Sequence, residues 1–195
     1  MRIGLLGGSF DPPHIGHLLS AVDAYEALAL DRLVFIPAAV QPLKAGRACA
    51  TAEHRLAMTR LLIGGDPRFD VSAIEIDRGG LSYTVDTLTT LAAAWPGAEL
   101  FWLVGVDVLK SFPKWKEPAR IVQLATLVVV KRVGTGDGDE TPDLSSIPGE
   151  PRLLATRRID LSSTEIRDRV REGKSIRGFV PEAVADYIAA ERLYR

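Results

Sequence analysis

A glycine-rich segment with two histidines constrains the fold of this chain more than any other feature. It reads GGSFDPPHIGHL over residues 7–18 and directly follows the apolar run 1–6. The apolar run predicts a buried strand, the glycines permit a tight turn, and apolar positions after Gly16 recur at helical spacing. The sequence therefore predicts a strand-to-helix turn, with a helix over about 17–29.

Such a turn is suited to binding a phosphate. Unpaired N–H groups at a helix N-terminus favour an anion, and the histidines His14 and His17 are close enough in sequence to donate hydrogen bonds to one anion together. Alone, a glycine-rich turn is common and a single histidine is usually a packing or surface residue. No GxGxxG motif and no Walker GK[ST] loop is present, so a phosphate site of another class is expected.

A second segment, LSSTEIR over residues 161–167, predicts the start of another helix. Ser162 or Ser163 can cap it, and Arg167 falls where a guanidinium could hold phosphate oxygens. Taken alone, this pattern is typical of a capped surface helix. Together with the first segment, it indicates a polyphosphate site built from two distant parts of the chain.

In this order the two segments resemble the signatures of the nucleotidyltransferases of the HxGH superfamily. The resemblance implies that His14, His17 and Arg167 are catalytic, the histidines stabilising charge while the α-phosphate of the nucleotide is attacked. It implies an ATP site that also includes Gly7, Gly8, Ser9, Phe10, Gly105, Asp107, Ser162 and Ser163.

Within that superfamily the chain most resembles the bacterial nicotinate mononucleotide adenylyltransferases. The short landmarks mean little singly, and their collinear order carries the resemblance: HR at 54–55, SYT at 82–84, GVD at 105–107, PKW at 113–115, KR at 131–132 and LYR at 193–195. The family transfers the adenylyl group of ATP to nicotinate mononucleotide and forms deamido-NAD and pyrophosphate. ATP and nicotinate mononucleotide are therefore the expected partners.

The resemblance also implies a second set of residues for the pyridine nucleotide. In the family, Thr84 and its neighbour bind the nicotinate carboxylate, and the tryptophan that matches Trp115 stacks on the pyridine ring. From the residues alone, 82–84 precede a helical run whose amides can receive a carboxylate, whereas Trp115 is most simply a half-buried packing residue. The full set is Ser9, Phe10, Lys44, Ser82, Tyr83, Thr84, Trp115 and Arg132.

For three of the predicted site positions, Lys44, Asp107 and Arg132, the sequence leaves the interpretation open. The family usually reads PPHK where this chain has Gln41, Pro42, Leu43 and Lys44, so the loop departs from the pattern while the lysine is retained. Asp107 follows an apolar strand and can either accept hydrogen bonds from ribose hydroxyls or cap the next turn. Arg132 is either a phosphate ligand or a solvated cation at a strand end.

The expected mechanism has no covalent intermediate, because no serine, cysteine or lysine stands beside a base. The phosphate of the mononucleotide is already anionic, so the protein must supply alignment and charge neutralisation rather than a general base. Mg²⁺ is expected on the triphosphate, held mainly by substrate phosphates, with no protein metal site.

The whole pattern predicts an α/β fold with a doubly wound, mostly parallel, Rossmann-like sheet covered by helices on both faces. Strands are expected at 32–36, within 69–76, at 99–104 and at 127–131, and helices at 52–63, 84–94, 163–171 and 181–192. Residues 1–195 are expected to form one domain, with the C-terminal helices completing the site. The stretch 134–150, rich in Gly, Pro, Ser and acids, predicts an exposed, mobile loop without a catalytic role.

Composition excludes several other classes. A formal net charge of -1 gives no basic footprint for nucleic acid, and Cys49 as the single cysteine excludes an internal disulfide. No apolar stretch is long enough for a membrane span and the N-terminus has no signal-peptide pattern, so a cytoplasmic enzyme is expected.

Three rival interpretations remain. Pantetheine-phosphate adenylyltransferases share both signatures but tend to be shorter and lack this order of SYT, GxD and PKW. A cytidylyltransferase would normally carry an RTxGIST form of the second motif. A non-catalytic nucleotide-binding protein on the same fold would have less need of His14, His17 and Arg167.

Overall fold

A six-stranded sheet, wound outward in two directions from its first strand, organises the molecule. The computed structural model describes residues 1–42, 49–133, 142–145 and 147–195, without the side chains of Val108, Lys110 and Arg132. The strand order is β3-β2-β1-β4-β5-β6, and each neighbouring pair is parallel. The strands are β1 (Arg2–Gly8), β2 (Arg32–Pro37), β3 (Phe69–Val71), β4 (Glu99–Gly105), β5 (Thr126–Val133) and β6 (Arg152–Arg157).

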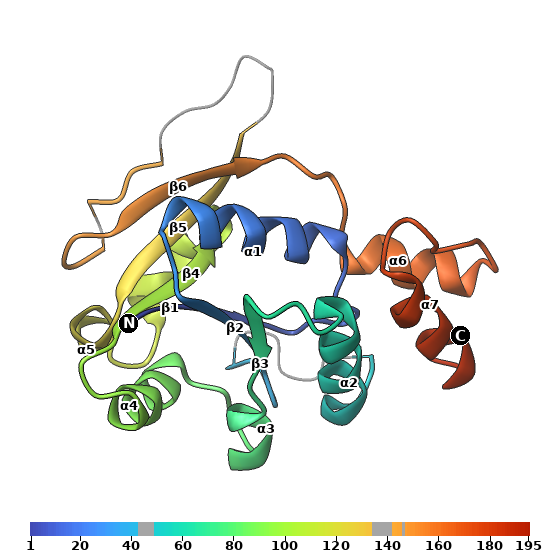
Figure 1. Cartoon of the computed structure of the whole chain (residues 1–195), viewed down its shortest axis with the longest axis horizontal. Helices are drawn as coiled ribbons and strands as arrows, with labels where there is room; N and C mark the ends of the chain where they lie inside the picture. Colours follow the sequence, from blue (N-terminus) through green and yellow to red (C-terminus); the bar gives the residue numbers. More distant parts are fainter. Residues whose placement is uncertain (43–48, 134–141, 146) are drawn as a thin grey trace.

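Helices cover both faces of this sheet, as the sequence predicts (Figure 1). One face packs against α1 (Ile15–Ala27), α2 (Ala52–Ile63), α6 (Ser163–Arg171) and α7 (Glu182–Ala190). The other packs against α4 (Thr84–Ala94), α5 (Pro118–Leu124) and the 3₁₀ segment η2 (Val106–Lys114). The predicted doubly wound α/β class is therefore confirmed, and the direction of winding reverses between β1 and β4.

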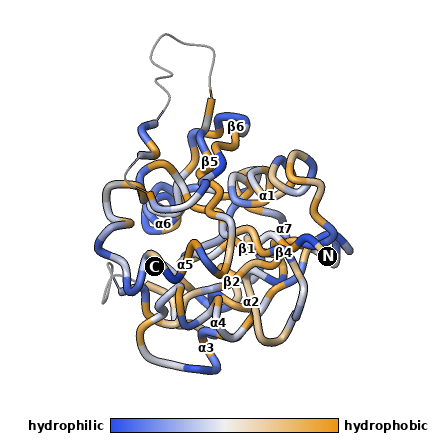
Figure 2. The backbone as a smooth tube through the Cα atoms, turned by 90° about the vertical axis from the view of Figure 1, so that its left-hand side faces the viewer, coloured by the Kyte–Doolittle hydropathy of each residue, from blue (hydrophilic) through white to orange (hydrophobic). Residues whose placement is uncertain are grey.

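Successive side chains along each strand point to opposite faces of the sheet and so pack in two different cores. Phe101 and Leu103 of β4 belong to the core under α1, whereas Trp102 and Val104 belong to the core under α4. Because both faces are buried, the central strands are apolar almost throughout, and Figure 2 shows their hydrophobic colouring beside the more hydrophilic outer segments. No helix in the described part of the chain is long and apolar enough to cross a membrane.

Helix bounds agree with the sequence where local capping signals are strong. Thr51 caps α2 by accepting a hydrogen bond from the His54 amide, and Gly64 ends the helix in the left-handed conformation. Ser162 caps α6 in the same way through the Glu165 amide. The predicted ranges 52–63 and 163–171 are therefore confirmed. The range 84–94 is confirmed as well, although no side chain caps α4, whereas α1 begins at Ile15, two residues before the predicted start.

Other elements were not predicted. Helix α3 (Ile74–Arg78) occupies the end of the range 69–76 in which a strand was expected, and η2, α5 and β6 are additional. Strand β6 lies at the sheet edge and buries only alternate residues, so it lacks a continuous apolar run. In the stretch 134–150, expected to be exposed, Ile147 is instead buried in the core, while 134–141 and 146 lie outside the described residues.

Candidate active site

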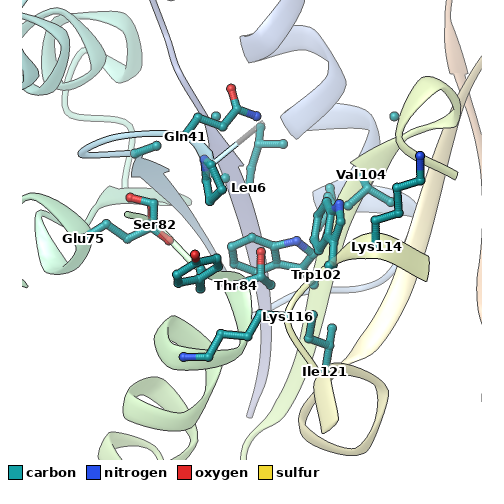
Figure 3. A pocket seen from close by; sticks show the side chains of 18 residues that line it. Leu6, Gln41, Glu75, Ser82, Thr84, Trp102, Val104, Lys114, Lys116 and Ile121 are labelled. Atoms are coloured by element: carbon teal, nitrogen blue, oxygen red, sulfur yellow. The ribbon is translucent and has the colours of Figure 1, made fainter. Parts of the chain in front are cut away.

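A cavity of about 210 Å³ opens where the carboxyl ends of β1 and β4 meet (Figure 3). This is the point at which the winding reverses, where open α/β sheets bind their ligands. The predicted site residues that line it are Gly7, Gly8, Ser82, Tyr83, Thr84, Gly105 and Trp115.

The glycines of this cavity leave room for neighbouring side chains. A Cβ on Gly7 would lie 2.8 Å from Cζ2 of Trp102, which also lines the cavity, and a Cβ on Gly8 would lie 3.0 Å from Cζ of Phe10. At Gly105 a Cβ would come within 2.5 Å of Oδ1 of Asp107. Larger residues at these three positions would therefore displace Trp102, Phe10 or Asp107, and Trp102 lines the cavity itself.

The two histidines are stacked at the start of α1. Their ring centroids lie 3.7 Å apart with an interplanar angle of 31°, and the backbone N–H of His14 donates to Nδ1 of His17 over 3.1 Å. Because Nδ1 of His17 accepts, the neutral ring carries its proton on Nε2, which makes that atom a hydrogen-bond donor. His14 is the N-cap residue and is buried, whereas His17 is half-buried in the first turn.

Gly16 is required by the position of the His14 ring. A Cβ at residue 16 would lie 3.0 Å from both Cε1 and Nδ1 of His14. The glycine between the histidines thus lets the imidazole lie against the first turn of α1. The amides of that turn are less available than the sequence predicts, since those of Ile15 and His17 bond to the carbonyls of Phe179 and His14.

The second motif meets the first directly. Nη1 of Arg167 donates to the carbonyl oxygen of Asp11 over 2.7 Å, and Oγ of Ser163 donates to the carbonyl of Pro12 over 2.8 Å. Ser162, the cap of α6, adjoins Ser163. Figure 1 shows α6 beside the end of α1 that carries the histidines. The structure therefore brings Ser162, Ser163 and Arg167 to the same place as the His14 and His17 turn.

The side chains of the remaining predicted site residues do not line the cavity or lie outside the described residues. The Phe10 ring is buried and meets His17 edge-on at 5.2 Å, so only the Phe10 backbone can reach a ligand. Asp107 is exposed and lies in the first turn of η2. The N-cap of η2 is Gly105, so the alternative prediction that Asp107 caps this turn is wrong. Ser9 donates through Oγ to Oε1 of Gln41 over 2.9 Å. Lys44 and the Arg132 side chain lie outside the described residues.

The residues predicted to bind the pyridine nucleotide include the start of α4 and Trp115. Tyr83 is the N-cap residue and Thr84 the first residue of the helix, while the hydroxyl of Ser82 accepts from the Ala39 amide over 2.9 Å. Trp115 is half-buried against Phe112 at 5.4 Å, and in the described part of the chain no group accepts from its buried Nε1. The indole thus combines a packing contact with a face on the cavity.

Three buried charged residues, Asp11, Arg55 and Glu75, were given no role by sequence reasoning. Arg55, 2% exposed, donates to the carbonyls of Ser9, Ala39 and Ala50 over 2.7, 3.0 and 3.3 Å. Burial lowers the pKa of its guanidinium, partly offset by the nearby Asp11 carboxylate. The HR landmark contained Arg55, but only the structure shows that this residue joins three segments of the chain.

Glu75 is buried as well, on the cavity side of the sheet. It lines the cavity at 4% exposure, and its Oε1 accepts from the Thr87 hydroxyl over 2.6 Å. Figure 3 shows Glu75 next to Ser82, which also donates to it. Burial raises the pKa of the Glu75 carboxyl, and the hydrogen bonds from Thr87 and Ser82 oppose that rise. The flanking isoleucines favoured a strand and gave no signal for a buried acid.

The chain matches known nucleotidyltransferases over nearly all its length. The cytidylyltransferase-like family model matches residues 5–169. A protein of Gemmatimonas aurantiaca named "Probable nicotinate-nucleotide adenylyltransferase" is 52% identical over all of this chain and 93% of its own length. A protein of the same name from Thermus thermophilus is 48% identical over the full length of both chains. The chain therefore belongs to the cytidylyltransferase-like family and, within it, to the nicotinate-nucleotide adenylyltransferases.

The fold agrees with a solved structure of more distant sequence. The Plasmodium falciparum nicotinic acid mononucleotide adenylyltransferase complexed with NaAD superposes with a TM-score of 0.76 at 20% identity, covering 99% of this chain and 97% of that one. Within the residues that the structure describes, no group of three or more His, Cys, Asp or Glu side chains could hold a metal ion.

The raised pKa of Glu75 makes the stability of the protein depend on pH. The folded-state pKa lies above the ordinary value of 4.5, so the native state favours the protonated acid, and ionisation on raising the pH lowers the free energy of unfolding. We therefore compare the free energy of unfolding of Glu75→Gln with that of the unmodified protein, measured with urea at several pH values. As the pH rises above 4.5 and through the raised pKa, the difference should shift in favour of Glu75→Gln, which has no carboxyl to ionise. The same change at exposed Glu150 controls for loss of one charge, and a pH-independent difference at Glu75 would contradict the expectation.

Proposed function

We propose that this protein transfers the adenylyl group of ATP to nicotinate mononucleotide, forming deamido-NAD and pyrophosphate in NAD biosynthesis. The observation that carries the proposal is the Arg167–Asp11 contact, which joins the second motif to the turn of the paired histidines. Membership of a family whose close relatives bear the name of this activity supports it.

The triphosphate is proposed to lie against the start of α1. Nε2 of His17 and the guanidinium of Arg167 would contact the phosphate oxygens together with His14. In the described part of the chain, buried Nε of Arg167 has no hydrogen-bond acceptor, so a bound anion could supply one. Further proposed ATP contacts come from Gly7, Gly8, Ser9, the Phe10 backbone, Gly105, Asp107, Ser162 and Ser163.

The pyridine nucleotide is proposed to occupy the cavity. The amides of Thr84 and Val85, at the start of α4, have no acceptor among the described residues and would bind the carboxylate. Trp115 would stack on the ring. Ser82, which also lines the cavity, is proposed to contact the substrate, and its hydrogen bonds with Ala39 and Glu75 would hold the loop in place. Ser9, the Phe10 backbone, Lys44, Tyr83 and Arg132 complete the proposed substrate contacts.

In the proposed reaction, a phosphate oxygen of nicotinate mononucleotide forms a bond to the α-phosphorus of ATP while the bond to pyrophosphate breaks. The attacking oxygen is already anionic, so the side chains orient both nucleotides and offset charge. We propose that Mg²⁺ is bound mainly by the triphosphate, where it offsets part of the negative charge. We also propose that residues 1–195 act as one domain, which the contacts between the α6 start and residues 11–12 support, and that the protein works in the cytoplasm.

A choice of acceptors tests the proposed function. Pyrophosphate release from ATP would be measured with nicotinate mononucleotide, nicotinamide mononucleotide and phosphopantetheine offered separately. We expect the acid to react most efficiently, because helix amides favour a carboxylate over a neutral carboxamide. Preference for phosphopantetheine would favour the rival adenylyltransferase, and no release with any acceptor would favour a nucleotide-binding protein.

Replacing His17 tests the charge-stabilising role. One preorganised donor to developing negative charge typically contributes about 10²–10³ in rate, so His17→Ala should lower kcat by about that factor. Thermal unfolding should change little, since His17 is only half-buried. His54→Ala removes the third histidine, which bonds to Tyr187, and serves as the control. A near-normal kcat for His17→Ala would remove that residue from the mechanism.

Replacing Trp115 tests the location of the pyridine ring. Since stacking concerns one substrate, Trp115→Ala should raise the KM for nicotinate mononucleotide about tenfold or more and change that for ATP much less. Trp95, also half-buried but absent from the cavity lining, provides the matched tryptophan-to-alanine control. Equal effects of Trp115→Ala on both KM values would contradict the stacking role.

A further inference from the structure

The segment after α7 places a tyrosine in the interior by means of unfavourable backbone conformations. Helix α7 ends at Ala190, and the residues that follow include Arg192 and Tyr194, with φ of 53° and 65°. Residues other than glycine rarely adopt this left-handed region. Tyr194 is nevertheless only 8% exposed. A side chain held at such a conformational cost is expected to make a specific contact.

That contact is with the phosphate-binding turn. The hydroxyl of Tyr194 donates to Oδ1 of Asp11 over 2.8 Å, across 183 positions of sequence. The Asp11 carboxylate, itself buried, also accepts from the amides of Cys49 and Ala50 over 2.7 and 3.1 Å. Burial and the neighbouring Asp11 carboxylate raise the pKa of Tyr194 above its ordinary value, so the hydroxyl keeps its proton and remains a donor.

Asp11 holds the tyrosine through its side chain and the second motif through its backbone. Its carbonyl oxygen accepts from Nη1 of Arg167, and the next carbonyl, of Pro12, accepts from Ser163. A shift of Asp11 would therefore move the acceptor that orients the Arg167 guanidinium. The chain of contacts leads from Tyr194 through Asp11 to Arg167.

We propose that Tyr194 is a positioning residue of the ATP site, which fixes Asp11 so that Arg167 faces the triphosphate. The inference rests on the proposed function in assigning the triphosphate to Arg167. It adds a residue near the end of this chain, which the first two motifs do not contain, and gives the LYR landmark a physical role.

A second tyrosine provides the matched control. The hydroxyl of Tyr187 on α7 hydrogen-bonds to Nδ1 of His54 on α2 over 2.9 Å. Tyr194 also approaches α2, with its hydroxyl 4.0 Å from Sδ of Met58. Tyrosine-to-phenylalanine changes at the two positions therefore each remove one hydroxyl near α2, but only Tyr194 contacts Asp11.

The experiment compares Tyr194→Phe with Tyr187→Phe. Titration with a non-hydrolysable ATP analogue should show about tenfold weaker binding for Tyr194→Phe, the size expected when a misplaced Arg167 loses one charge-assisted hydrogen bond to a phosphate. Its KM for ATP should rise likewise, while the KM for nicotinate mononucleotide stays within about twofold. Tyr187→Phe should leave both substrates unaffected. Thermal unfolding of each variant shows how much of any loss comes from stability.

A second variant keeps the test decisive if Tyr194→Phe does not fold. Asp11→Asn retains the shape and one acceptor oxygen, and should weaken binding of the ATP analogue in the same selective way. Unchanged affinity for the analogue in the folded variant, or equal losses for ATP and the mononucleotide, would overturn the inference. If the unmodified protein binds the analogue but releases no pyrophosphate with any acceptor, the proposed function fails while the positioning role of Tyr194 is still decided by the titration.

Discussion

The arrangement of this molecule depends on hydrogen bonds between the turn after β1 and the start of α6. Arg167 and Ser163 donate to consecutive backbone carbonyls, at Asp11 and Pro12, from positions more than 150 residues later in the chain. Backbone carbonyls are obligatory acceptors, and buried ones need a partner. These bonds therefore satisfy the turn and at the same time bring a cation to the stacked histidines.

The second half of the site is positioned by the sheet, through the pairing of β1 with β4. Strands β1 and β4 are neighbours, and their carboxyl ends leave space because the connections turn away in opposite directions. The start of α4 and Trp115 close that space from the other face of the sheet. The two proposed nucleotide-binding regions thus follow from one topological feature, with β1 between them.

Local signals were sufficient for much of the fold and for part of the site. The start of α6 followed from its capping serine, and the bounds of α2 and α4 followed from apolar spacing. That residue 16 must be glycine because the His14 ring lies against it is seen only in the structure. The buried roles of Glu75 and Arg55 arise from partners far away in sequence, so no local pattern indicates them. Strand β6 was missed because an edge strand with alternate burial lacks an apolar run.

Arg55 also determines how the site responds to its ionic surroundings. Its guanidinium is enclosed, and its described hydrogen bonds go to three carbonyl dipoles instead of to a surface carboxylate. Dissolved ions screen exposed pairs such as Arg177 and Asp186 far more effectively than contacts from which solvent is excluded. The backbone around Ser9 and Ala39 is thereby insulated from changes in ionic strength, even while the charged exterior of the protein responds to them.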